Sequence, residues 1–218
     1  EKQAIQRQQG ANSRDLKGWW YSEMLNTTST FTESMTLFWH NHFTSSLKKV
    51  KTPNLLFEQN ATLRTHALGN FADMLRAMTF DPAMMKYLDT VNSKAGAPNE
   101  NFARELMELF TLGEGQGYTE DDIREAARAF TGWGYTADRE LILRPQSHDN
   151  DTKSFFGRSG NFDGNDIIDI LLEQPRVAVH ITEKLWRHFV SATPNSAEIS
   201  RLATLFRDSA YELKPLMR

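Results

Sequence analysis

The stretch of the sequence best suited to chemistry is residues 99–113, NENFARELMELFTLG. Its apolar residues recur with the period of an amphipathic helix that opens on an asparagine N-cap and stops at a glycine. On such a helix Asn101, Glu105 and Glu108 project within roughly 60° of one another. Two carboxylates and an amide that face one cavity are suited to acid–base catalysis. The alternative is a solvated face with i,i+4 ion pairs to Arg104.

Two histidines lie close together in residues 34–43, SMTLFWHNHF. The apolar residues here follow the helical period, so His42 falls in an aromatic stripe and His40 points about 160° away. One metal ion therefore cannot take both imidazoles. His42 is either a buried neutral histidine that hydrogen-bonds a carbonyl or carboxylate, or a metal ligand or catalytic base that lines a pocket.

The other candidate metal ligands are spread along the chain. His66 flanks the apolar arc of a predicted helix, near its end, where it could point into a cleft. His148 and Asp149 lie where no helix is predicted, and a histidine with carboxylates is a set that binds metal ions. The alternative for this pair is an ordinary polar loop. We expect His180 to be solvated.

Two further patterns concern side chains at the edges of helices. Arg128 flanks the inward face of a predicted helix, and it would pair with Glu105 or Glu108 if the two helices were neighbours. Trp19 and Trp20 stand at the edge of an element, where they would either pack in the core or stack against sugar rings or peptides.

These candidates must be positioned by helices. Capping residues before proline and capping-box patterns predict helix starts, and almost no segment alternates as a strand does. We predict an all-α fold, one globular domain over residues 1–218, with one long irregular loop near residues 132–160 and at most a short strand at 140–143. The ten predicted helices span residues 13–27, 31–45, 53–67, 70–79, 82–89, 99–112, 120–131, 164–174, 176–190 and 195–211.

The composition excludes several classes of protein. The 25 basic and 28 acidic residues give a net charge of −3, so there is no basic field to attract nucleic acid, and we expect none to bind. The chain has no cysteine, which excludes disulfides, thiolate metal sites and a cysteine nucleophile. It has no apolar run of about 18 residues, so we expect no membrane span.

Six segments of the sequence together point to a known family. They are HNHF at 40–43, HALGNF at 66–71, the central block at 99–113, EAARAFTGW at 125–133, His148-Asp149 with Lys153 and Gly157, and GNFDG at 160–164. Together they resemble the bacterial domain of unknown function 1800 family, from about residue 19 to the C-terminus. The likeness departs at residues 134–144, where the connection is short.

The resemblance implies a mostly helical, exported protein, periplasmic or at the cell surface. It also implies that the chain is an internal portion of a larger member, and that a possible partner is the product of a neighbouring uncharacterised gene. The family brings no established activity. It adds weight to the polar residues that match its signature blocks, namely His40, His42, His66, Asn101, Arg104, Glu105, Glu108, Arg128, His148, Asp149 and Lys153.

Two classes of function then compete. The first is a hydrolase, in which a divalent metal activates water or paired carboxylates cleave a glycosidic bond. Its catalytic residues would be Asn101, Glu105, Glu108 and Arg128, and its metal ligands His42, His66, His148 and Asp149. The second is a noncatalytic binding or assembly module of the cell envelope with a structural Arg–Glu network. A hydrolase should gather these groups in one deep pocket, whereas a module should show them as surface pairs or buried ties.

Overall fold

The structure is a computed structural model that describes the backbone of residues 2–218 and the side chains of residues 7–218. Within this part of the chain it is mostly helical, with twelve α-helices. The helix α7 runs directly into a π-helical segment, η2 (Leu106–Thr111). The α-helices are α1 (Lys2–Asn26), α2 (Thr30–His42), α3 (Leu47–Val50), α4 (Pro53–His66), α5 (Phe71–Thr79), α6 (Pro82–Tyr87), α7 (Glu100–Glu105), α8 (Glu120–Ala129), α9 (Gly164–Leu172), α10 (Pro175–Phe189), α11 (Ser196–Asp208) and α12 (Leu213–Leu216).

All ten predicted helices are present, with shifted boundaries. The first begins at Lys2 instead of residue 13, because Gly10 interrupts the helical pattern in the sequence without ending the helix. The four-residue helices α3 and α12 were not predicted, since one turn is too short to show a period.

The expectation of a purely helical fold is corrected by two β-hairpins in the segment predicted to be irregular. The strands β1 (Trp133–Tyr135) and β2 (Leu141–Leu143) pair antiparallel, as do β3 (Lys153–Phe155) and β4 (Arg158–Gly160). Each strand is three residues long, too short to show sustained alternation, so β1, β3 and β4 were not predicted. The expected short strand at 140–143 corresponds to β2. A 3₁₀ turn, Pro145–Ser147, lies between the hairpins, and another, Thr90–Asn92, follows α6.

Helix starts follow the capping chemistry of the sequence. Thr119 and Asp122 form a capping box at α8, and Asp163 and Asp166 form one at α9. The start of α11 is capped by Asn195, whose side-chain oxygen accepts from the N–H groups of Ala197 and Glu198. These caps fix where α8, α9 and α11 begin, and so orient the side chains that follow.

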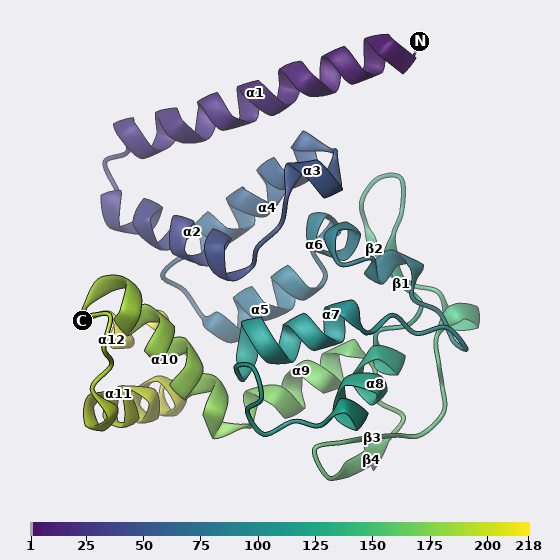
Figure 1. Ribbon diagram of the computed structural model, residues 1–218, viewed down its shortest axis with the longest axis vertical. Coiled ribbons are helices and arrows are strands. Elements are labelled where there is room, and N and C mark those ends of the chain that lie inside the picture. Colours follow the sequence, from purple (N-terminus) through teal and green to yellow (C-terminus); the bar gives the residue numbers. More distant parts are fainter. Residues whose placement is uncertain (1) are drawn as a thin grey trace.

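The helices are arranged in tiers (Figure 1). The long helix α1 lies across one end of the molecule, over α2, α3 and α4, while α5, α7, α8 and α9 form the middle. The helices α10, α11 and α12 pack together at the side where the chain ends. The helix with three of the four predicted catalytic residues, α7 with η2, therefore lies at the centre.

One large apolar core joins the tiers and holds α7 in place. Trp39, Phe71, Phe102 and Phe206, from four different helices, are fully buried in it. Burying each aromatic side chain contributes about 1.5–3 kcal/mol. The indole N–H of Trp39 also donates to the carbonyl oxygen of Ala67 at 3.0 Å, which ties α2 to the end of α4. A second, smaller apolar cluster lies beneath α1.

The π-helical segment changes which side chains face the core. At 100° per residue Leu109 belongs to the apolar arc, but in the structure it is 45% exposed, whereas Phe110 is 3% exposed. The N–H groups of Leu112 and Gly113 both reach back to the carbonyl oxygen of Met107, at 2.9 and 3.1 Å. A widened turn of this kind shifts the phase of the helix, and such turns are frequent at functional sites.

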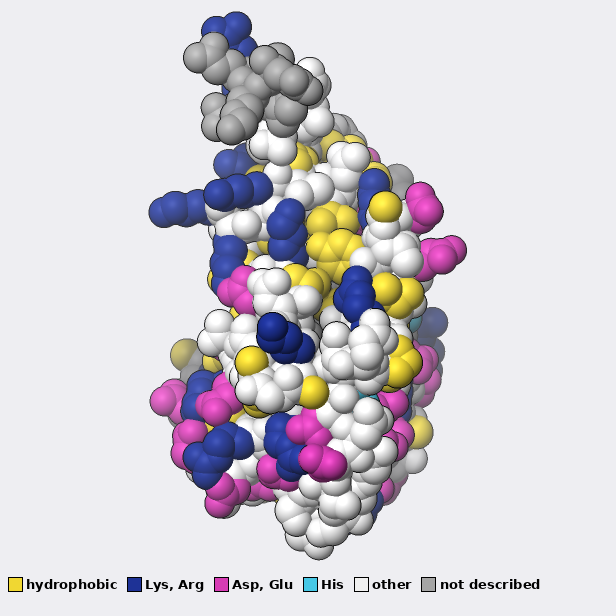
Figure 2. Space-filling view, turned by 90° about the vertical axis from the view of Figure 1, so that its right-hand side faces the viewer, with side chains coloured by type: hydrophobic (Ala, Val, Ile, Leu, Met, Phe, Trp, Pro, Cys, Tyr) yellow, Lys and Arg dark blue, Asp and Glu magenta, His cyan; other side chains and the backbone are white. Residues whose placement is uncertain are grey.

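Charged side chains of both signs cover the surface. Figure 2 shows acidic and basic groups mixed over the lower half of one face, and mainly basic groups beside exposed hydrophobic ones above. In the described part of the chain, no helix combines the length and the hydrophobicity needed to cross a bilayer.

Candidate functional site

The three predicted catalytic residues of the central helix do not share one cavity. Glu105 lines a pocket of about 320 Å³ together with Lys49 and Tyr87, and neither Asn101 nor Glu108 lines it. The side chain of Asn101 is exposed. Burial raises the pKa of Glu105, and the nearby charge of Glu108 raises it further. Of the three residues, only Glu105 combines a pocket with the raised pKa of a proton donor.

Arg104 holds the polar face of α7 against the start of α8. Its guanidinium donates to both carboxylate oxygens of Glu120, at 2.9 and 2.8 Å, and lies 3.4 Å from carboxylate oxygens of Glu100 and Glu108. The expected i,i+4 pairs are therefore present, and a residue from the next helix adds the shortest contacts. The charge of Glu108 is used in this surface network.

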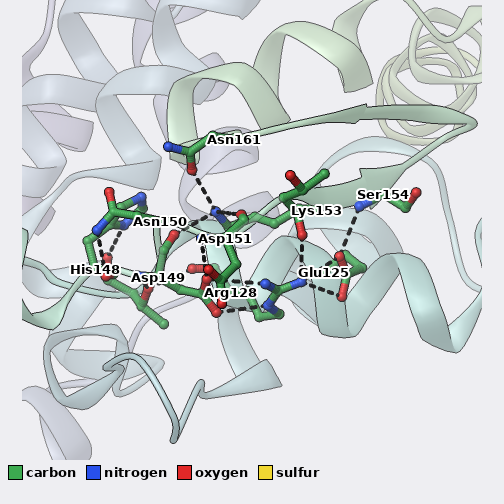
Figure 3. Close-up of polar contacts among 11 residues, drawn as sticks. Glu125, Arg128, His148, Asp149, Asn150, Asp151, Lys153, Ser154 and Asn161 are labelled. Carbon is green, nitrogen blue, oxygen red and sulfur yellow. Dashed lines mark hydrogen bonds and ion pairs between the residues drawn. The ribbon is translucent and has the colours of Figure 1, made fainter.

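Arg128 is the centre of a second polar network (Figure 3). Its Nε and Nη2 donate to the two carboxylate oxygens of Asp149 at 2.8 and 3.1 Å, and Nη1 donates to Glu125 at 2.8 and 2.9 Å. Nη1 also donates to the carbonyl oxygen of Thr152 at 3.2 Å. The expected pairing with Glu105 or Glu108 is not what the structure shows; Arg128 instead joins α8 to the loop before β3. The hydrogen bonds from Arg128 lower the pKa of Asp149, so this carboxylate stays ionised.

The same loop is held by Lys153 and His148 (Figure 3). Lys153 is fully buried, and its Nζ donates to the carbonyl oxygens of Asp149 and Asp151 at 2.6 and 3.1 Å and to Oδ1 of Asn161 at 3.3 Å. The Nδ1 of His148 lies 2.8 Å from the carbonyl oxygen of Thr131. The bonds of Lys153 therefore hold the loop together, and the bond of His148 ties the loop to the end of α8.

His42 is a buried histidine bonded to a carbonyl, which was one of its two expected roles. It is 3% exposed, and its Nε2 lies 3.2 Å from the carbonyl oxygen of Phe110. Burial, with the nearby Lys184 and His180, holds the pKa of His42 well below its ordinary value, so the ring is neutral and Nε2 carries the donated proton. Its buried Nδ1 meets no partner among the described residues. As predicted, His40 faces elsewhere, packing edge-on against Trp20.

Sequence reasoning missed His180 and Lys184, which stand at i,i+4 on α10. The Nε2 of His180 and the Nζ of Lys184 lie 3.2 and 3.3 Å from one acceptor, the carbonyl oxygen of Leu109. His180 was expected to be solvated, but burial lowers its pKa to about 4, and burial lowers the pKa of Lys184 to about 8. The i,i+4 pair of basic residues was the available signal, but its acceptor lies 71 positions away in sequence.

These contacts, with one from Arg176, supply donors to three carbonyls at the end of the central helix. The last carbonyls of a helix lack partners within it and carry partial negative charge. Here His42, His180 and Lys184 supply donors to Leu109 and Phe110, and the Nε of Arg176 donates to Leu112 at 3.0 Å. The arrangement caps the helix from two neighbouring helices.

The four side chains predicted to bind a metal are not gathered at one place. His42 lies against η2, His148 and Asp149 lie beside α8, and His66 is the last residue of α4. Among the described side chains, no group of three or more histidine, aspartate or glutamate residues is arranged to hold a metal ion. A pocket of about 300 Å³ beside His42 is lined by groups from α2 and α10 that include Lys184 and Arg187. These cations disfavour a metal there.

Comparison with known proteins places the chain by family. No curated protein and no solved structure matches it. One family model does match, and it covers residues 1–218, which extends the resemblance seen from about residue 19 to the whole chain. The chain therefore belongs to the family described as "Protein of unknown function (DUF1800)".

Proposed function

We propose that this chain is a noncatalytic binding or assembly module of the cell envelope, in which arginine, glutamate and histidine contacts hold the helices together. The observation that carries the proposal is the bonding of Arg128, all three of whose guanidinium nitrogens donate to protein oxygens at 2.8–3.2 Å. Arg104, His148 and Lys153 are bonded to protein groups in the same manner. A noncatalytic module is expected to use such residues in this way, in buried hydrogen bonds and surface ion pairs that stabilise the fold.

An enzyme would instead bring its reacting groups to one concave pocket. The pocket beside Glu105 is lined by neither Glu108 nor Arg128, and His42 lines a different pocket with cationic neighbours. The separation of these groups supports the module over the metal-dependent hydrolase.

A second candidate, a carboxylate-dependent hydrolase, is favoured by one observation. Burial and the charge of Glu108 raise the pKa of Glu105, which lines a pocket of about 320 Å³. A carboxyl group with a raised pKa is a suitable general acid. In this alternative Glu105 protonates the leaving group of a substrate held in that pocket.

The envelope location and the partner are parts of the proposal that come from the family resemblance. We take the partner to be the product of a neighbouring uncharacterised gene. Co-expression of the two proteins with a tag on this chain tests that part, and the expected result is a complex that stays together through size-exclusion chromatography. Separate elution of the two proteins would contradict it.

The choice between module and hydrolase is tested on the purified protein. Elemental analysis should give far less than one metal ion per chain. A panel of p-nitrophenyl glycosides, esters and phosphates should be hydrolysed no faster by the wild type than by Glu105→Gln. One metal ion per chain, or a hydrolysis that Glu105→Gln abolishes without changing the melting temperature, would overturn the module proposal.

A further inference from the structure

A pocket of about 170 Å³ lies beneath the long helix α1 and belongs to none of the networks described above. It is lined by residues of α1, α2, α3 and α4 and of the loop after α2, the tier at one end of Figure 1. The lining residues are Leu16, Lys17, Trp19, Trp20, His40, Ser45, Leu47, Leu56 and Asn60. An engineered cavity of about 150 Å³ in another protein takes up benzene, so this pocket has room for a molecule with one ring.

Asn60 is the polar group that distinguishes this pocket from a packing defect. It is 4% exposed, and neither its Oδ1 nor its Nδ2 meets a hydrogen-bond partner among the described residues. The side chain stands in the apolar stripe of α4, between Leu56 and Leu63. Leaving a buried donor or acceptor unsatisfied costs about 1–3 kcal/mol, so an asparagine here calls for a partner that fills both roles.

The aromatic wall of the pocket is held in place by a chain of polar contacts. The indole N–H of Trp20 donates to Glu33 at 2.6 Å, and Glu33 accepts two hydrogen bonds from Arg64 at 2.9 and 3.0 Å. The guanidinium of Arg64 in turn lies over the ring of Trp19, 5.2 Å from its centroid. Both indoles are thus positioned before any ligand arrives, which reduces the entropy lost on binding.

The groups inside the pocket favour an uncharged ligand. Burial lowers the pKa of His40, so the imidazole is neutral at pH 7. The hydroxyl of Ser45 donates to Gln59, and the side chain of Lys17, the only charged residue in the lining, is exposed to solvent. A ligand that brought a charge into this space would lose its hydration with little return.

We propose that this pocket binds a neutral one-ring aromatic compound that carries a carboxamide or lactam. The ring packs against Trp19 and Trp20, and the ligand's amide donates to Oδ1 of Asn60 while accepting from Nδ2. A paired donor and acceptor of this kind is the arrangement by which asparagine reads an adenine edge. The inference deepens the proposed function, on which it rests, because it names a class of ligand for the module.

Benzamide is the probe, and acetophenone is its control. The two molecules have nearly the same shape, but acetophenone has no N–H to donate. Titration of the whole chain, followed by tryptophan fluorescence and by saturation-transfer NMR, should give saturable binding of benzamide with a Kd of about 0.1–10 mM, as expected for so few atoms. Acetophenone should bind at least about tenfold more weakly, the equivalent of one hydrogen bond.

Two variants on one helix locate the site. Asn60→Leu has nearly the same volume and should abolish the preference for benzamide over acetophenone, whereas Asn54→Leu, at an exposed position of α4, should leave it unchanged. No saturable binding of benzamide, or equal affinities for the two compounds in the wild type, would overturn the inference even if Asn60→Leu failed to fold. A preference that survives in folded Asn60→Leu would also overturn it. Because metal content and hydrolysis are measured separately, failure here is distinguishable from failure of the module proposal.

Discussion

Arg128 and Asp149 meet through two parallel hydrogen bonds, Nε to Oδ2 at 2.8 Å and Nη2 to Oδ1 at 3.1 Å. The two side chains are 22% and 15% exposed, so water screens the pair only in part. Two-point contacts between guanidinium and carboxylate are among the stronger polar contacts in proteins. Because this one joins α8 to a loop 21 residues further along the chain, it stabilises the fold around that loop.

The central helix gives the first prediction. Replacing Glu105 by Gln should leave the free energy of unfolding unchanged or raise it by up to about 1 kcal/mol at pH 7, since the half-buried carboxylate has a raised pKa and a like charge beside it. The matched variant Glu108→Gln should lower the free energy of unfolding by less than about 1 kcal/mol, because Arg104 still has its ion pair with Glu120. Urea denaturation, with and without divalent ions, measures both. Strong destabilisation by Glu105→Gln would contradict this prediction and show that the Glu105 carboxylate makes a contact that stabilises the fold.

The second prediction concerns His42. Replacement by alanine should lower the free energy of unfolding by about 2–4 kcal/mol, because it removes a bond to Phe110 and leaves a cavity in the aromatic core. His188→Ala, at an exposed position, should change it by less than about 1 kcal/mol. Chemical denaturation gives both values. A His42→Ala protein as stable as the wild type would contradict the core role.

The third prediction is a dependence of stability on pH through His180. Burial lowers its pKa from 6.5 to about 4 in the folded chain. Between these values the unfolded chain holds the proton and the folded chain does not, so stability is complete above pH 6.5 and falls as pH is lowered toward 4. His180→Gln keeps a donor for Leu109. In this variant the free energy of unfolding lost between pH 6.5 and 4 should be smaller by about 1–2 kcal/mol, after allowance for solvent screening.

Melting curves at several pH values test the third prediction. His188→Gln, an exposed histidine on the same helix, is the control and should leave the fall unchanged. The variant should still lose some stability as pH is lowered, because the pKa of His42 is also lowered in the folded chain. Lys184, with a pKa of about 8, titrates above this range. Identical curves for the wild type and His180→Gln would refute the assignment.

The fourth prediction concerns Gly132, in the turn after α8, which packs against the segment that carries His148. Gly132 has φ of +79°, and a Cβ there would lie 2.9 Å from the carbonyl oxygen of Arg144 and 2.9 Å from the backbone nitrogen of His148. Gly132→Ala should therefore lower the free energy of unfolding by about 1–3 kcal/mol. Gly18→Ala, on α1 with nothing within 4 Å of the new Cβ, should raise it by up to about 1 kcal/mol. Equal effects in denaturation would show that the turn at residue 132 tolerates a side chain.

Local signals in the sequence were sufficient for most of the fold. Capping boxes such as Thr119 with Asp122, and apolar residues at the helical period, mark the helices because both effects act within a few residues. Apart from β2, the strands of the two hairpins were not predicted, because three-residue strands show no sustained alternation. The burial of His42 followed from its aromatic stripe, but its acceptor, Phe110, lies 68 positions away and could not be inferred.

Two features of the candidate sites depend on information that periodicity does not contain. The π-helical turn at Leu106–Thr111 changes the phase of the helix, so the side assigned to Leu109 at 100° per residue is wrong. The two indoles that line the pocket beneath α1 are held by Glu33 and Arg64, which contact each other although they lie 31 residues apart. The signals for that pocket in the sequence were Trp19 and Trp20, expected either to pack in the core or to stack against sugar rings or peptides, and Asn60, a polar residue within an apolar arc.

The central claim is that the polar signature residues tie the fold together, and a double-mutant cycle on Arg128 and Asp149 tests it most directly. Urea denaturation at pH 7 of Arg128→Met, Asp149→Asn and the double variant gives the coupling, with Arg124→Met, an exposed residue on α8, as the control. We predict a loss of about 1–3 kcal/mol in each single variant and a coupling of about 1–2 kcal/mol. Single variants as stable as the wild type, with a coupling near zero, would contradict the account.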